Sequence, residues 1–210
     1  MKVRAVILVH GYNVSNLEVT VGKLRDHFEH YDYFVEALTY GFLPFTWQVT
    51  KHNRSIAKQL ADRVKHYQSI GFIVDVVGHS NGCTIGNLAT ELYGMKVNTF
   101  VAINPALKKD LNPCKNAELV QVWHNDGDVA VEVSMWLRWL SPWAIKSRPW
   151  GEQGKEGYTG EDSNVVNFDC SKDFIIKADG HSAVFKKPVS NFYLPTIARF
   201  CAREKKRVKQ

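Results

Sequence analysis

The sequence predicts an α/β fold in which a small, mostly parallel sheet is flanked by helices, with residues 1–210 forming a single domain. Two observations lead to this prediction. Short apolar runs of strand length alternate with helical patterns through the first half of the chain. One of these runs leads into a glycine-rich turn that opens a helix, within residues 72–93. A chain of 210 residues can also bury one sizeable core.

In chain order, a nearly continuous apolar run over residues 3–9 predicts a buried strand. Ser15 and Glu18 then form a capping-box signature for a crossover helix. Its apolar stripe comprises Leu17, Val21, Leu24 and Phe28. A second strand is predicted over residues 33–38. An aromatic-rich loop, 40–47, separates that strand from a helix over about residues 50–67, whose apolar face comprises Ile56, Leu60, Val64 and Tyr67.

The third predicted strand, 72–77, precedes a helix over residues 83–93 that stops at Gly94. Further strands are predicted at 99–103 and 119–123, so that strands and helices alternate as in right-handed βαβ units. The last strand is either 165–168 or 174–177, a choice that the pattern leaves open. A closing helix spans about residues 190–203, with Pro195 as its start or a kink.

The alternation breaks at residues 131–164, which we interpret as a lid or cap-like insertion before the last strand. Aromatic residues recur there at helical spacing, and two of them, Trp136 and Trp139, are candidates for binding substrate. The tryptophans can equally pack down as a satellite core, and the sequence does not decide between these alternatives.

Composition and charge narrow the classes of function. The formal charge is +6, but a visible share lies in residues 203–210, and no nucleic-acid recognition motif accompanies this tail. We therefore expect no nucleic-acid partner and leave the role of the tail open. The scattered cysteines argue against a zinc site or a disulfide framework and favour a cytoplasmic protein: Cys83, Cys114, Cys170 and Cys201. No apolar run reaches the length of a transmembrane helix.

The motif that carries chemistry is Gly78-His79-Ser80-Asn81-Gly82. Its place between a strand and a helix is the setting of a nucleophile elbow, in which a strained turn exposes the serine hydroxyl. Such a serine needs an imidazole to take its proton and a carboxylate to orient that imidazole, and these follow later in the chain. His181, in a late loop after Gly180, is the predicted base.

Three carboxylates compete for the acid position. Asp128 is preferred because apolar residues follow and anchor it, whereas Asp126 precedes Gly127 and is typical of a turn. Asp179 is the weaker third candidate, because the side chains of adjacent residues diverge from each other.

An oxyanion hole needs two donors. The backbone N–H of Asn81 is one candidate, and that of Tyr12, in the loop after the first strand, is the other. His10 and Gly11 in the same loop are candidates for contacting substrate.

Together, His10-Gly11 after the first strand, the elbow motif around Ser80, Asp128 and Gly180-His181 resemble the α/β-hydrolase superfamily, in particular its small bacterial and phage-type esterases and lipases. The resemblance implies a Ser80-Asp128-His181 triad that cleaves a small-molecule or lipid-like carboxylic ester through an acyl-enzyme, without metal or cofactor. Acyl transfer, amide hydrolysis and a non-catalytic binding protein on the same fold remain alternatives. The leading antiparallel strands usual in the superfamily are missing, and the oligomeric state stays undetermined.

Overall fold

The computed structural model describes residues 3–12, 17–40, 46–128 and 150–203. Its centre is a six-stranded sheet with the order β2-β1-β3-β4-β5-β6, in which every neighbouring pair is parallel. The strands are β1 (Arg4–Val9), β2 (Tyr33–Leu38), β3 (Ile73–His79), β4 (Val97–Ile103), β5 (Ala117–His124) and β6 (Val165–Asp169). The small parallel sheet predicted from the sequence is thereby confirmed.

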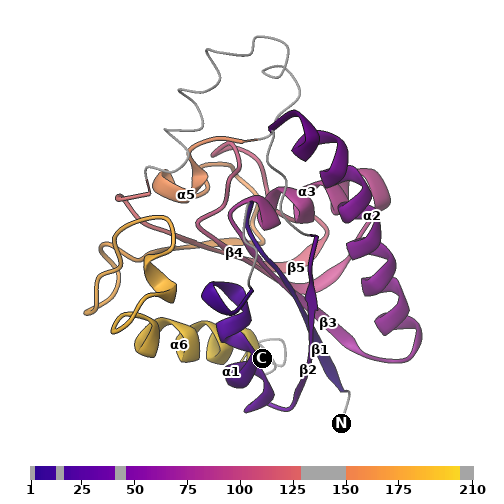
Figure 1. Cartoon of the computed structure of the whole chain (residues 1–210), viewed down its shortest axis with the longest axis horizontal. Coiled ribbons are helices and arrows are strands. Elements are labelled where there is room, and N and C mark those ends of the chain that lie inside the picture. The colour runs from indigo at the N-terminus through magenta and orange to yellow at the C-terminus, as the bar shows by residue number, and fades with distance from the viewer. Residues whose placement is uncertain (1–2, 13–16, 41–45, 129–149, 204–210) are drawn as a thin grey trace.

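Helices cover both faces of this sheet (Figure 1). The helices α2 (Thr46–Ser69) and α3 (Asn81–Tyr93) lie on one side, and α1 (Arg25–Glu29) and α6 (Ser190–Arg203) on the other. The strand β1 is buried throughout: Ile7 packs in the apolar cluster of α2 and α3, while Leu8 packs in the cluster of α6. This two-sided burial explains why its sequence is an uninterrupted apolar run.

One predicted element differs in kind from the structure. The crossover helix after β1 is divided into two 3-10 turns, Leu17–Val19 and Val21–Leu24, followed by the short α1. Successive β-branched residues, Val19 to Val21, disfavour an α-helix, and Thr20 has the non-helical dihedrals φ −133° and ψ −117°. Ser15, the predicted cap, lies outside the described residues.

The last strand is β6, so residues 174–177 are not a strand. Phe174 turns inward and stacks on Trp123 with ring centroids 5.5 Å apart, while its neighbour Ile175 is 98% exposed. The closing helix has the predicted bounds, with Pro195 inside it rather than at its start.

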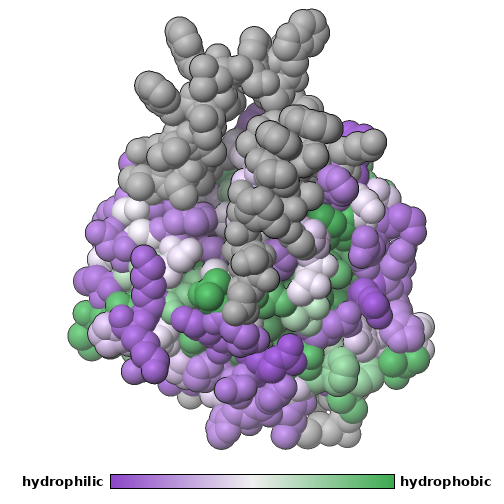
Figure 2. All heavy atoms as spheres, in the orientation of Figure 1, coloured by the Kyte–Doolittle hydropathy of each residue, from purple (hydrophilic) through white to green (hydrophobic). Residues whose placement is uncertain are grey.

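The surface seen in Figure 2 carries apolar residues in separate patches between hydrophilic ones. Among the described helices, none is both long and apolar enough to cross a membrane. Within the predicted insertion, Gln153–Glu156 form the short helix α5, whereas Trp136 and Trp139 lie outside the described residues. A lid or cap role for residues 131–164 therefore stays a prediction.

Candidate active site

The site is built at the carboxyl ends of the parallel strands, where loops from several strands meet. Val9 of β1 pairs with Gly78 of β3, which brings the loop after β1 beside the elbow. A Cβ atom added to Gly11 would lie 3.0 Å from the Cβ of Ser80. The predicted oxyanion loop and the predicted nucleophile are thus in direct contact.

Ser80 adopts the dihedrals φ 54° and ψ −118°, which a residue other than glycine rarely takes. Its backbone is held on both sides, since its N–H donates to Ile103 O at 3.0 Å and its carbonyl accepts from Cys83 N and Ala106 N. Half-buried, it caps the first turn of α3. The elbow expected from the motif is therefore present, with the strain that this turn requires.

The glycines of the motif are required by close backbone contacts. A Cβ on Gly82 would lie 2.3 Å from Val9 O, and one on Gly78 would lie 3.0 Å from the backbone of Gly82. Any side chain at Gly82 would push α3 away from β1, so the glycine sets how closely the helix can approach the strand.

Asp128 and His181 meet across the site. The Nδ1 atom of His181 lies 2.8 Å from Asp128 Oδ1 and 3.0 Å from Oδ2. The Asp128 side chain is fully buried, whereas 24% of the His181 side chain is exposed, so the imidazole stands between the carboxylate and solvent. Because a carboxylate only accepts, Nδ1 carries the hydrogen, and the other ring nitrogen, Nε2, keeps its lone pair.

The other two carboxylates are placed elsewhere. The exposed Asp126 pairs with Lys172 at 2.9 Å. Asp179 is exposed as well, and its carboxylate lies against the backbone of Gly127.

Two asparagines that sequence reasoning missed hold the predicted acid and the loop of the predicted base in place. Asn104, directly after β4, donates from Nδ2 to Asp128 Oδ2 at 3.1 Å. Asn125, directly after β5, accepts from Gly180 N at 2.8 Å and donates to Gly180 O at 3.2 Å. Both follow a strand at its carboxyl end, so the same positional rule that selected Ser80 and Asp128 could have found them.

The two predicted oxyanion donors belong to the two segments that meet at Ser80. Asn81 is the first residue of α3, and Tyr12 follows Gly11 in the loop after β1. Within the described residues, neither backbone N–H donates a hydrogen bond that would compete with an oxyanion. The positive end of the α3 dipole also points toward this place.

His10 supports this loop from beneath. Its buried ring stacks on Tyr40 with centroids 4.0 Å apart, and burial lowers its pKa. Nε2 accepts from Tyr40 N at 3.3 Å, so the hydrogen is on Nδ1, which donates to Gly11 O at 2.7 Å. Only 1% of the surface of His10 is exposed, so this residue supports the loop from inside, whereas Gly11 lies beside Ser80.

The Asn81 side chain makes four hydrogen bonds to three other parts of the chain. Its Oδ1 accepts from Asn53 Nδ2 at 2.9 Å and from Trp150 Nε1 at 3.2 Å. Its Nδ2 donates to Asn53 Oδ1 at 3.1 Å and to Tyr40 Oη at 3.2 Å. The residue after Ser80 is therefore tied to α2, to Tyr40 after β2, and to Trp150. These partners carry no sequence motif, and only the fold brings them together.

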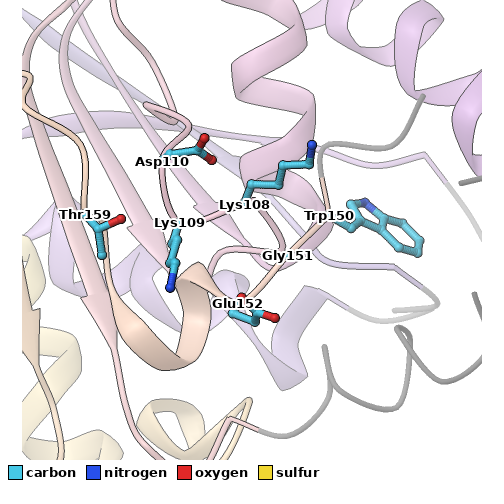
Figure 3. A pocket seen from close by; sticks show the side chains of 7 residues that line it. All are labelled: Lys108, Lys109, Asp110, Trp150, Gly151, Glu152 and Thr159. Carbon is cyan, nitrogen blue, oxygen red and sulfur yellow. The ribbon is translucent and has the colours of Figure 1, made fainter. Parts of the chain in front are cut away.

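A recess of about 350 Å³ lies beside this network, between the loop after β4 and the segment 150–159 (Figure 3). It is lined by Lys108, Lys109, Asp110, Trp150, Gly151, Glu152 and Thr159. Because the lining carries both positive and negative side chains, it favours neither an anionic nor a cationic ligand. Elsewhere in the described chain, as here, no group of three or more His, Cys, Asp or Glu side chains is arranged to hold a metal ion.

The fully buried His79 gives stability a pH dependence. Burial, with a smaller contribution from nearby His181 and His10, lowers its pKa from 6.5 to about 3. Between these values the unfolded chain binds a proton that the folded protein excludes. Stability should therefore fall as the pH drops below about 6.5, by up to roughly 1.4 kcal/mol per pH unit.

Urea unfolding at a series of pH values measures this slope, with His79→Gln as the control without the titrating imidazole. The slope of the variant should be smaller by about one proton. Equal slopes in the two proteins would contradict the assignment to His79.

Comparisons with known proteins agree with this architecture. No protein-family model and no curated protein matches the sequence. Among solved structures, the esterase Pf2001 of Pyrococcus furiosus has a TM-score of 0.59 at 14% identity, covering 96% of this chain and 83% of that one. Est1E of Butyrivibrio proteoclasticus, solved with bound ferulic acid, has a TM-score of 0.57 at 13% identity, covering 96% and 87%.

A Xanthomonas campestris protein, provisionally described as a hydrolase of the α/β superfamily, has a TM-score of 0.52 at 15% identity and covers 95% of this chain and 99% of that one. At such identities the likeness concerns the fold, and it extends over nearly the whole chain. Together with the all-parallel sheet and the strained turn at Ser80, it shows that the chain has the α/β-hydrolase fold.

Proposed function

We propose that this protein is a serine hydrolase that cleaves carboxylic esters through an acyl-enzyme. The observation that carries the proposal is the pair Asp128–His181, in which a fully buried carboxylate lies 2.8 Å from the imidazole of a late loop. The ring centroid of His181 is 5.0 Å from that of His79, the residue directly before the strained Ser80. Such a carboxylate–imidazole pairing orients an imidazole for removing a proton from a serine hydroxyl.

In the proposed mechanism, His181 Nε2 takes the hydroxyl proton of Ser80 while Ser80 Oγ attacks the ester carbonyl. Asp128 keeps the hydrogen on Nδ1 and stabilises the imidazolium that forms. The N–H groups of Asn81 and Tyr12 donate to the oxyanion of the tetrahedral intermediate. The tetrahedral intermediate collapses when the protonated His181 gives its proton to the leaving alcohol, which leaves an acyl-enzyme on Ser80. His181 Nε2 then takes a proton from a water molecule that attacks the acyl carbon. The bond to Ser80 Oγ breaks, Ser80 Oγ regains the proton from His181, and the carboxylic acid is released.

A fluorophosphonate probe tests the proposal, because it reacts with an activated serine. We expect one covalent adduct, located on Ser80 by peptide mass spectrometry. The matched variants are Asp128→Asn and Asp126→Ala: the first should slow labelling by about 10³-fold or more, because the wrong tautomer of His181 is favoured, and the second should leave the rate unchanged. A wild-type protein that is not labelled, or is labelled at another residue, would contradict the proposal.

A further inference from the structure

His79, the last residue of β3, lies beneath the loop that carries His181. Its side chain is 2% exposed, and its Nε2 atom lies 3.1 Å from the carbonyl oxygen of His181. Because a carbonyl only accepts, Nε2 must carry the hydrogen. The neutral ring then leaves Nδ1 as a bare acceptor, and this buried atom has no hydrogen-bond partner within the described chain. The ring is therefore committed to one hydrogen bond, the one that it donates to His181.

The same ring also packs against its surroundings on two sides. Its centroid is 5.0 Å from that of the His181 ring, and it meets Phe185 edge-on at 5.0 Å and 82°. Phe185 belongs to the 3-10 turn Ala183–Phe185 directly after His181 and is 1% exposed. These contacts fix the orientation in which Nε2 points at the carbonyl.

The loop needs such an anchor. Gly180, directly before His181, has φ 111°. Because glycine adopts many backbone conformations, it does not by itself fix the position of His181. Asn125 fixes the main chain at Gly180 with two hydrogen bonds, and Asp128 fixes the imidazole at Nδ1. Neither of these contacts holds the carbonyl of His181 itself, whereas His79 does.

We propose that His79 is a positioning residue, whose Nε2–H holds the main chain of His181 so that the imidazole stays within reach of Ser80. The inference rests on the proposed function of Ser80 and His181. His79 ends β3 and directly precedes Ser80 in the chain, so the end of this strand positions both the proposed nucleophile and its proposed base. His79 exchanges no proton in this role.

Two amide variants separate this role from simple filling of space. In His79→Gln the side-chain nitrogen can occupy the place of Nε2 and donate to His181 O. In His79→Asn the nitrogen occupies the place of Nδ1 and falls short of that carbonyl. We expect kcat for a p-nitrophenyl ester to fall roughly five- to tenfold in His79→Asn with KM unchanged, the order expected from losing one net hydrogen bond, and to stay within about twofold in His79→Gln.

Equal kcat in both variants, whether retained or lost, would overturn the proposal. A readout without activity covers the case in which a variant does not fold. In wild-type protein labelled with ¹⁵N-histidine, the nitrogen shifts of His79 should report the Nε2–H tautomer between about pH 5 and pH 8. The Nδ1–H tautomer would overturn the inference. If wild-type protein hydrolyses no ester while His79 shows the Nε2–H tautomer, the failure belongs to the proposed function, and the positioning role falls with it.

Discussion

Replacing Ser80 with alanine is expected to lower kcat/KM for ester hydrolysis by about 10⁵-fold or more. The variant loses the atom that attacks the carbonyl, and neither His181 nor the oxyanion donors can substitute for it. Residual hydrolysis above the uncatalysed rate would come only from oxyanion stabilisation and substrate binding. Hydrolysis of p-nitrophenyl esters of graded chain length measures the effect and also gives the acyl preference of the wild-type protein.

The fold should survive this change. Alanine at φ 54° is about as unfavourable as serine, and the backbone bonds from Ser80 N and to Ser80 O do not involve the hydroxyl. The melting temperature should therefore stay close to that of the wild type. Ser69→Ala, at the far end of α2, is the matched control and should keep full activity. A Ser80→Ala protein that is folded and retains the hydrolytic rate of the wild type would end the assignment.

The elements that sequence reasoning predicted well are those in which one short-range pattern dominates. The strand β2 and the helix α6 have the predicted bounds, because a run that is apolar except for Glu36 and a helical pattern each had no local competitor. The prediction of one continuous helix after β1 was wrong. The apolar stripe from Leu17 to Phe28 favours a helix, but the three successive β-branched residues from Val19 to Val21 disfavour one. The choice of the last strand depended on Phe174 packing on Trp123, a contact distant in sequence.

The candidate site likewise contains residues that a local pattern predicts and residues that only contacts distant in sequence bring together. Ser80 belongs to a motif with a required backbone geometry, so its surroundings were predictable from residues 78–82. The apolar residues after Asp128 favoured it over Asp126, and the structure places Asp128 against His181 and Asp126 against Lys172. The role that we propose for His79 was not predicted from the sequence, because a histidine directly before the motif serine has no sequence signature of its own.

The opposite end of the sheet carries the second large expected effect, on stability. Asp75 of β3 is fully buried and accepts hydrogen bonds from Arg4 Nη2 at 2.6 Å, Asn98 Nδ2 at 2.8 Å and Thr99 N at 2.9 Å. The carboxylate thus joins β1, β3 and β4 at their amino ends, and the Arg4 guanidinium lies 4.9 Å from the ring centroid of Tyr33. Asp75→Asn should lower the free energy of unfolding by about 3–5 kcal/mol, because it leaves the Arg4 charge buried without a counter-charge.

Urea unfolding of a double-mutant cycle tests this reason rather than the loss alone. Asparagine keeps an oxygen for Asn98 and Thr99 N, so the lost stability should come from the uncompensated guanidinium. Adding Arg4→Met to Asp75→Asn should therefore recover part of the loss, since methionine fills the space without a charge. Breaking the exposed pair Lys58–Asp62, whose atoms are nearly as close at 2.7 Å, should have almost no effect, because water already solvates both ions. If the double variant is less stable than Asp75→Asn, the cost lies in packing or hydrogen bonding. Activity per folded molecule should stay at the wild-type level in every member of the cycle, because the pair lies at the end of the sheet remote from Ser80.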